Sequence, residues 1–279
     1  MRIADQLIGH TRVLALTSSA DHRMAQLRAA GIVPLRGNLD APKTLQRLAG
    51  LAQRVIHMAP PAPVGCADGR TQSLLAALRR RSKPKTLVYG STSGVYGDCG
   101  GDSVVESRAV NAGTERGLRR EDAEGRLRHW GRVTTVTVCI LRIPGIYAPN
   151  RDGGTPRTRL FKGLPVLEAT QDVYTNHIHA DDLARACSLA LWRGKPQRVY
   201  NVCDDSDLKM GDYFDLAADL YGLTQPPRVT RLDAARMLSP MQLSFMGESR
   251  RLVNTRMKRE LRLRLRYPTV HTGLISGTL

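Results

Sequence analysis

An α/β fold with a doubly wound parallel sheet and a smaller C-terminal lobe is predicted from three features of the sequence. Short apolar strands alternate with helices up to about residue 98, as in a parallel sheet with right-handed crossovers. One apolar strand, Thr86 to Tyr89, leads into the polar, glycine-rich segment Gly90 to Gly94. The run Thr135 to Arg142 is the richest in β-branched residues, and Pro144 closes it.

The first half of the chain divides into short strands and helices with recognisable boundaries. Ser18 to Asp21 contain the residue types that cap a helix, and Gly31 ends the helix that they start. A proline in the first turn starts the helix at Pro42. The predicted strands are 12–17, 32–35, 54–59 and 86–89, and the predicted helices are 3–8, 21–30, 42–51 and 72–81.

Beyond Asp98 the alternation becomes less regular. A polar, glycine-bearing loop to about Gly113 precedes a highly charged helix from Thr114 to Trp130. The later predicted strands are 135–142, 173–179 and 198–202, the later helices are 181–192 and 210–221, and the remaining residues form a helical, basic tail. We therefore expect a sheet domain over residues 1–150. Residues 151–279 should form mainly a substrate-binding lobe, with some segments returning to the sheet.

Composition predicts a cytoplasmic protein with reduced thiols. No stretch of the 279 residues is long and apolar enough to span a bilayer, and the first twelve residues lack the apolar core of a signal peptide. The five cysteines are odd in number, widely spaced and without a CxxC pair, so neither a disulfide framework nor a zinc site is expected.

The formal charge of +17 is compatible with an anionic partner. The arginines are spread through helical segments, and only 5% of residues are aromatic, which leaves few rings to stack on bases. We interpret most of this charge as solvated helix faces. A nucleic-acid surface is not favoured, and an anionic small-molecule site stays open as an alternative.

Ser91, Thr92 and Ser93 follow the strand Thr86 to Tyr89. Ligands of open α/β sheets bind outside the carboxyl ends of the strands, so these hydroxyls are candidate catalytic or binding groups. The alternative interpretation is a capped turn without chemistry, because serine, threonine and glycine also favour turns.

Four motifs resemble, in order and spacing, those of the extended short-chain dehydrogenase/reductases, the NAD(P)-dependent epimerase/dehydratase superfamily that acts on nucleotide sugars. The motifs are STSGVYGD at 91–98, LRIPGIYAP at 141–149, HIHADDLARA at 177–186 and RVYNVCDD at 198–205, and 249–269 is similar to the family's closing segment. The resemblance covers nearly the whole chain. It implies a Rossmann-like, NAD(P)-binding oxidoreductase with a nucleotide-sugar-like or other carbonyl or carbinol substrate, and it allows a homodimer.

The resemblance places Thr92 at the family's catalytic Ser/Thr position, with Ser91 and Ser93 beside it. The family also uses a tyrosine and a lysine four residues later for proton transfer, because hydride moves only as the oxygen loses or gains a proton. This chain has Arg116 and Arg120 at those positions. Arginine stays protonated near neutral pH, so a cofactor-binding pseudoenzyme, sensing or scaffolding without turnover, is the alternative.

The resemblance also implies cofactor contacts. Small polar residues with a nearby arginine favour NADP over NAD at the end of the first strand. The implied residues there are Thr17, Ser18, Ser19 and Arg23; those near the adenine and its ribose are Asn38, Leu39, Met58, Ala59 and Pro60; those near the nicotinamide are Pro144 and Ile146.

Two further expectations concern the first strand and metals. The family begins with a strand and a GxxGxxG turn that holds the pyrophosphate, whereas this sequence opens on what resembles the later part of the helix that follows. We expect a truncated or mis-started reading frame; the alternative is a protein that lacks this phosphate-binding turn. His177 and His179 could suggest a metal site, but no third ligand stands at a recognisable spacing, so none is expected.

Overall fold

A four-stranded parallel sheet forms the centre of the molecule in the computed structural model, which describes residues 1–19 and 21–276. The strands are β3 (Arg54–His57), β4 (Thr86–Thr92), β6 (Thr137–Ile143) and β11 (Arg198–Asn201), in the order β11-β6-β4-β3. β4 and β6 pair along their whole length, from Thr86 opposite Thr137 to Thr92 opposite Ile143. All of β4 except Thr92 is buried, as expected for a strand covered on both faces.

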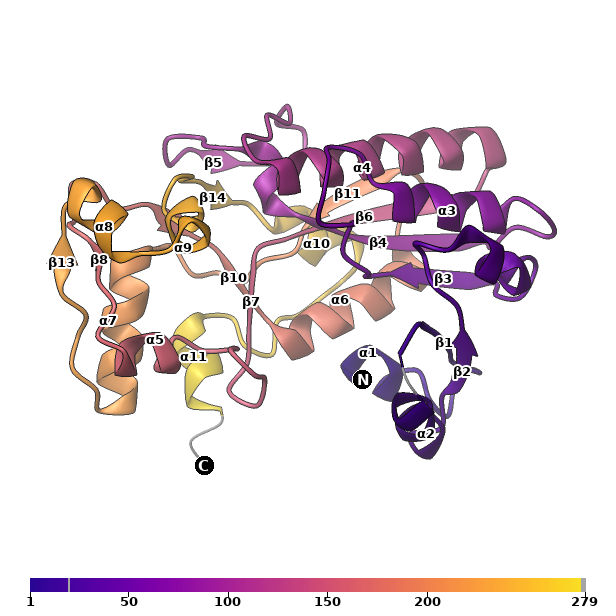
Figure 1. Cartoon of the computed structure of the whole chain (residues 1–279), viewed down its shortest axis with the longest axis horizontal. Helices are drawn as coiled ribbons and strands as arrows, with labels where there is room; N and C mark the ends of the chain where they lie inside the picture. Colours follow the sequence, from indigo (N-terminus) through magenta and orange to yellow (C-terminus); the bar gives the residue numbers. More distant parts are fainter. Residues whose placement is uncertain (20, 277–279) are drawn as a thin grey trace.

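Helices cover both faces of this sheet (Figure 1). α3 (Gly69–Leu78) and α4 (Glu115–Thr134) lie on one face, and α6 (Ala180–Arg193) lies on the other. Successive residues of β4 point to opposite faces, so Leu87 packs with Trp130 of α4, whereas Val88 packs with Cys187 of α6. Asp68 caps α3 by accepting hydrogen bonds from the backbone of Arg70 and Thr71.

The first elements form a separate two-stranded sheet beside this domain (Figure 1). The elements are α1 (Arg2–Asp5), β1 (Leu14–Thr17), α2 (Asp21–Ala29) and β2 (Val33–Arg36). Within residues 1–19 and 21–276, β1 pairs only with β2 and β3 pairs only with β4. Ile3 and Leu7 pack against the core beneath α6, and Arg2 forms an ion pair with Asp181 at the start of α6.

The C-terminal lobe has its own apolar core, which includes Val166, Phe214 and Leu274. Its helices are α5 (Arg157–Phe161), α7 (Met210–Tyr221), α8 (Arg231–Met237), α9 (Pro240–Phe245) and α11 (Val270–Ile275), around the strand pair of β8 (Val166–Leu167) and β13 (Arg228–Val229). The connecting pairs are β7 (Gly145–Tyr147) with β10 (His177–His179), β9 (Tyr174–Thr175) with β12 (Leu208–Lys209), and β5 (Ser103–Val104) with β14 (Arg251–Leu252). α10 (Thr255–Glu260) packs back against β11.

The predicted α/β class is confirmed, and several predicted elements need correction. Residues 42–51 contain a 3₁₀ helix, η1 (Pro42–Leu48), in place of an α-helix. The predicted strand 173–179 is divided into β9 and β10, and the tail contains β13 and β14 between its helices. β4 extends through Ser91 and Thr92 before the 3₁₀ turn η2 (Ser93–Tyr96), so the glycine-rich turn starts later than expected. Ala20, in the predicted cap segment, lies outside the described residues.

Four of the five cysteines are buried, and Cys66 is exposed. Burial raises the pKa of the Cys139 and Cys187 thiols to about 12, so both stay protonated. In the part of the chain that the structure describes, no helix combines the length and apolar character needed to cross a bilayer.

Candidate functional site

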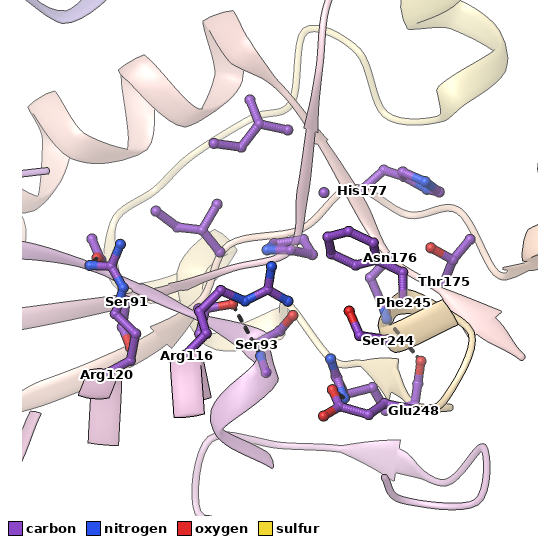
Figure 2. Close-up of a pocket in the computed structure, with 18 of the residues that line it drawn as sticks. Ser91, Ser93, Arg116, Arg120, Thr175, Asn176, His177, Ser244, Phe245 and Glu248 are labelled. Atoms are coloured by element: carbon purple, nitrogen blue, oxygen red, sulfur yellow. Dashed lines mark hydrogen bonds and ion pairs between the residues drawn. The ribbon is translucent and has the colours of Figure 1, made fainter. Parts of the chain in front are cut away.

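A cavity of about 680 Å³ lies between the sheet domain and the C-terminal lobe. We call it the interlobe cavity. One wall comes from the carboxyl ends of β3, β4 and β6 and the first turns of α4; the other comes from β9, β10, α5, α7 and α9. Figure 2 shows the two sets of side chains facing each other, with Ser91, Ser93, Arg116 and Arg120 opposite Asn176, Ser244 and Glu248. This is where α/β sheets bind ligands, beside the carboxyl ends of their parallel strands.

Ser91, Thr92 and Ser93 all line the interlobe cavity, but their hydroxyl groups differ in what they contact. Thr92 is the N-cap of η2, and its Oγ1 accepts a hydrogen bond of 3.2 Å from the Gly94 backbone. An accepted bond leaves the hydroxyl proton free to be donated. Ser91 Oγ instead donates to Glu124 Oε1 at 2.7 Å. Ser91 is therefore held by the protein, and Thr92 is the better placed hydroxyl for a ligand.

Glu124 is the centre of a buried polar group behind this wall. Arg142 donates to both of its oxygens, at 3.1 and 2.7 Å, and the side chains of both residues are almost fully buried. The Arg142 guanidinium lies 4.5 Å from the ring centroid of Tyr96, and the Tyr96 hydroxyl donates to Asn201 at 2.7 Å. These bonds join α4, β4, β6 and β11, which fixes the strand ends that carry Ser91 and Thr92.

Arg116 and Arg120 of α4 line the cavity at the positions where the sequence resemblance implies tyrosine and lysine. Arg120 Nη1 donates to the Gly90 carbonyl at 2.6 Å and to the Tyr89 hydroxyl at 3.0 Å. The Arg116 guanidinium lies 4.9 Å from the ring centroid of Phe245, across the cavity. Within the described residues, neither arginine pairs with a carboxylate, so both keep a net positive charge facing the cavity.

The C-terminal lobe adds two more arginines to the cavity wall. Arg250 is neutralised by Glu248 at 2.8 Å. Arg159 has no carboxylate partner among residues 1–19 and 21–276; it donates to the Pro165 carbonyl at 2.6 Å and stacks on Phe214. The cavity therefore presents an excess of positive charge.

The pKa values of two titratable groups of the cavity lie far from neutral pH. His177 is buried, and burial lowers the pKa of its imidazole to about 4. Burial likewise raises the pKa of the neighbouring Tyr213 phenol, whose ring centroid lies 4.1 Å from that of His177. Neither is suited to act as a general acid or base near pH 7.

Four of the residues that the resemblance implies for the cofactor line the interlobe cavity. Met58 and Pro60 were implied for the adenine and ribose side, and Pro144 and Ile146 for the nicotinamide side; Gly90 lines the cavity beside them without a side chain. A Cβ at Gly90 would lie 2.6 Å from Met58 Sδ, so this part of the wall is closely packed and preformed. The other residues implied for the cofactor lie outside the cavity: Thr17, Ser18, Ser19, Arg23, Asn38, Leu39 and Ala59.

Thr17 ends β1, Ser18 and Ser19 follow it, and Arg23 lies in the first turn of α2; Asn38 and Leu39 follow β2, and Ala59 follows β3. Thr17 Oγ1 accepts from the Ser19 backbone, and Arg23 is exposed and bonds only to Gln26 among its described neighbours. Asn38 Oδ1 accepts from the backbone of Asp40. Leu39 packs against the core of the sheet domain. The family's glycine-rich pyrophosphate turn is not among the described residues.

His177 and His179 lie on either side of Tyr147, with their ring centroids 6.2 and 5.3 Å from that of Tyr147. His179 accepts from the Asp181 backbone and caps α6. The structure, where it describes the chain, contains no group of three or more His, Cys, Asp or Glu side chains that could hold a metal ion.

A family model matches residues 40–203, which include β3 to β11 and the carboxyl ends of the strands at the interlobe cavity. The model describes the NAD-dependent epimerase/dehydratase family. This chain belongs to that family. The sequence resemblance and the Rossmann-like α/β fold are therefore confirmed.

Among curated proteins, this family member is 29% identical to Protein YeeZ of Escherichia coli K12 over 150 residues, which are 54% of this chain and 51% of YeeZ. The matched part thus spans about half the length of that relative. A functionally unknown conserved protein from Silicibacter pomeroyi has a similar structure, with 28% identity, a TM-score of 0.77, and coverage of 99% of this chain and 92% of its own.

Two structures below 25% identity show the shared fold. UDP-glucose 4-epimerase of Thermotoga maritima is 18% identical, with a TM-score of 0.78 and coverage of 98% and 91% of the two chains. RMD of Pseudomonas aeruginosa, solved with NADPH, is 20% identical, with a TM-score of 0.72 and coverage of 95% and 97%.

Sequence reasoning missed Arg159, Phe245 and Arg250 as cavity residues. Arg159 and Phe245 come from segments with no recognised motif, and Arg250 lies in the closing segment, to which no site role was given; the packing of the C-terminal lobe against the sheet brings all three to the cavity. Arg159 had one available signal, the basic run between Arg157 and Lys162, but that run also fits a solvated helix.

Proposed function

We propose that this family member is an NAD(P)-linked oxidoreductase that acts on an anionic carbonyl or carbinol compound, nucleotide-sugar-like or smaller, with NADP preferred. One observation carries the proposal. Thr92 and the implied nicotinamide-side residues Pro144 and Ile146 share a single cavity with arginines that lack a described carboxylate partner. Hydride donors of this kind need an apolar wall for the nicotinamide and a hydrogen-bond donor for the substrate oxygen.

Each group then has a distinct role. The Thr92 hydroxyl donates to the carbonyl or carbinol oxygen, since Gly94 uses only its acceptor side. Arg116 and Arg120 hold an anionic group of the substrate by charge-assisted hydrogen bonds. A bound cofactor would supply or accept the hydride, and the proton that the substrate oxygen gains or loses would be exchanged with water through the Thr92 hydroxyl.

The preference for NADP rests on Arg23 and the hydroxyls of Thr17, Ser18 and Ser19. Arg23 is exposed and has no described carboxylate partner, whereas the neighbouring Arg36 pairs with Asp21. A free guanidinium at the end of β1 is suited to a ribose phosphate.

Calorimetric titration of the full chain with NADP and NAD, at low and moderate salt, tests the cofactor. Saturable binding that prefers NADP, and a preference that falls about tenfold or more in Arg23→Gln, is expected. Arg28→Gln, on the same helix, is the control. A folded chain that binds neither nucleotide contradicts the proposal. The same preference for NADP over NAD in Arg23→Gln and Arg28→Gln contradicts the role of Arg23.

A second candidate function is ligand binding without turnover, favoured by Arg116 and Arg120. Neither guanidinium can exchange protons near neutral pH, and His177 and Tyr213 do not replace them. The double variant Arg116→Tyr, Arg120→Lys separates the two functions. Each chain is assayed for NADPH oxidation with a panel of carbonyl compounds. Oxidation by the double variant alone supports the pseudoenzyme, whereas oxidation by the wild-type chain supports the enzyme.

The proposal also includes a cytoplasmic location and a homodimer. Buried, protonated thiols at Cys139 and Cys187 suit a reducing compartment. Leu118 and Val133 on α4 are 37% and 59% exposed and give that helix apolar surface for a second copy. Sedimentation equilibrium of wild type and Val133→Glu tests the dimer, which the added charge should dissociate; a wild-type monomer contradicts it.

A further inference from the structure

The C-terminal side of the interlobe cavity carries a half-buried cation, Arg159, that no carboxylate of the described residues neutralises. Arg159 Nη2 donates to the Pro165 carbonyl at 2.6 Å, and the guanidinium carbon lies 4.6 Å from the ring centroid of Phe214. Nε is buried and has no hydrogen-bond partner among residues 1–19 and 21–276. The Pro165 carbonyl and the Phe214 ring contact part of the Arg159 guanidinium, and no described carboxylate balances its charge.

Such an arrangement is unfavourable unless an anion completes it. A guanidinium removed from water loses solvation that only a negative charge or a full set of acceptors restores. Burial accordingly lowers the pKa of Arg159. Arg157, two residues earlier on α5, offers the contrast: its side chain is exposed and stacks on Phe161 and Tyr221 outside the cavity. Water can solvate the exposed Arg157, whereas the buried Nε side of Arg159 faces a part of the cavity where a ligand would have to supply the partner.

Arg159 is separate from the arginines already assigned to the substrate. Arg116 and Arg120 belong to α4 on the sheet domain, whereas Arg159 belongs to α5 in the C-terminal lobe. All three line the same cavity, together with the apolar and aromatic side chains of Met210, Tyr213 and Phe214. The cavity thus has one positive wall on each side and an apolar surface contributed by α7.

We propose that Arg159 forms a second anion subsite and that the substrate is a small compound with a carboxylate or phosphate at each end. One anionic end binds Arg116 and Arg120, and the other binds Arg159. This inference rests on the proposed function, because it names the substrate class of the same site. It selects against neutral sugars and against compounds with one charge.

The test compares linear dicarboxylates, from succinate to adipate, with monocarboxylates of equal length by calorimetric titration of the full chain. In the wild type, the best dicarboxylate should bind at least about tenfold more tightly than its monocarboxylate, since a second charge-assisted contact is made. Because Arg159→Gln leaves the other arginines in place, the change in this ratio between wild type and variant isolates the contribution of Arg159 from binding to surface arginines. Arg159→Gln should reduce this ratio to about one.

Arg157→Gln is the matched control and should keep the wild-type ratio. Arg159→Lys, which retains the charge, should recover part of it, and thermal unfolding of each variant confirms that the chain is folded. A ratio near one in the wild type, or an unchanged ratio in Arg159→Gln, overturns the second subsite. If NADP still binds in those cases, the proposed function stands alone; a wild-type chain that binds neither NADP nor any carboxylate overturns both.

Discussion

Ser91 and Arg142 stand opposite each other on β4 and β6, and both donate to the same oxygen of Glu124. The strand register places the hydroxyl and the guanidinium side by side, and α4 supplies the carboxylate that joins them. This buried group holds the end of β4 in place, one residue before Thr92. The position of the candidate catalytic hydroxyl therefore depends on an ion pair that does not itself touch the ligand.

Glu124→Gln is expected to lower the free energy of unfolding by about 3–5 kcal/mol, because it leaves the Arg142 guanidinium buried without its counter-charge. Urea unfolding followed by circular dichroism measures the change. Arg128→Gln is the control, because Arg128 bonds to the same carboxylate from a side chain that is 38% exposed and should cost less than about 1 kcal/mol. Equal losses in the two variants contradict the importance of the buried pair.

Thr92→Val is expected to leave the affinity for NADP within about twofold and to lower turnover by about a hundredfold or more, because the substrate oxygen loses its hydrogen-bond donor. Thr92→Ser should keep most of the activity, since it retains both the hydroxyl and the bond from Gly94. Steady-state kinetics with any substrate found in the carbonyl panel checks both. Full activity in Thr92→Val would mean that the hydroxyl only caps the turn and takes no part in catalysis.

The stability of the protein should depend on pH through Asp204, which is 3% exposed and whose pKa is raised by burial from 3.8 to about 7. The folded chain binds this proton more tightly than the unfolded chain. Below about pH 4 the carboxyl group is protonated in both states and does not reduce the free energy of unfolding. Ionising it destabilises the fold progressively as pH rises toward 7, by at most about 4 kcal/mol. Asp204→Asn should remove that penalty.

Urea unfolding of wild type and Asp204→Asn at pH 5 and pH 8 measures the effect as a difference. The difference is needed because His57 and His177, whose pKa values burial lowers to about 4, act with the opposite sign and stabilise the fold as pH rises toward 6.5. We expect the variant to gain stability relative to wild type between the two pH values. A difference in unfolding free energy between variant and wild type that is the same at pH 5 and pH 8 contradicts the raised pKa of Asp204.

Phe245→Ala is expected to weaken carboxylate binding about two- to fivefold, because the ring stacks on Arg116 and orients its guanidinium. Met241→Ala is the matched control on α9, since Met241 is 70% exposed and does not line the cavity. Calorimetric titration with a dicarboxylate compares the two. Tighter binding in Phe245→Ala indicates that the ring competes with the ligand for Arg116.

The sequence was sufficient for the parallel sheet because its strands are buried on both faces and therefore read as apolar runs, as in Leu87 to Tyr89 and Val138 to Leu141. It was insufficient where tertiary contacts decide the local structure. Residues 42–48 form a 3₁₀ helix although their composition suits an α-helix, and Asn176 separates β9 from β10 by bonding to the Arg250 and Leu252 backbone.

The candidate site divides in the same way. Thr92, Arg116 and Pro144 stand in or at a fixed spacing from motifs, and they do line the interlobe cavity. Ser91 stands in the same motif, but its role depends on Glu124, 33 residues away. Arg159 and Phe245 reach the cavity only because the C-terminal lobe folds back over the sheet, which no local pattern of residues expresses.

The arrangement of the thiols makes the chain easy to label. Cys66 is the single exposed cysteine, in the loop whose Gly65 carbonyl accepts a hydrogen bond of 2.6 Å from Arg119, a residue of the cavity wall. The other four are enclosed and are protected from reagents in the folded state. A maleimide dye should therefore attach once per native molecule, on a loop bonded to a residue of the cavity wall, where its fluorescence can report ligand entry without any engineered residue.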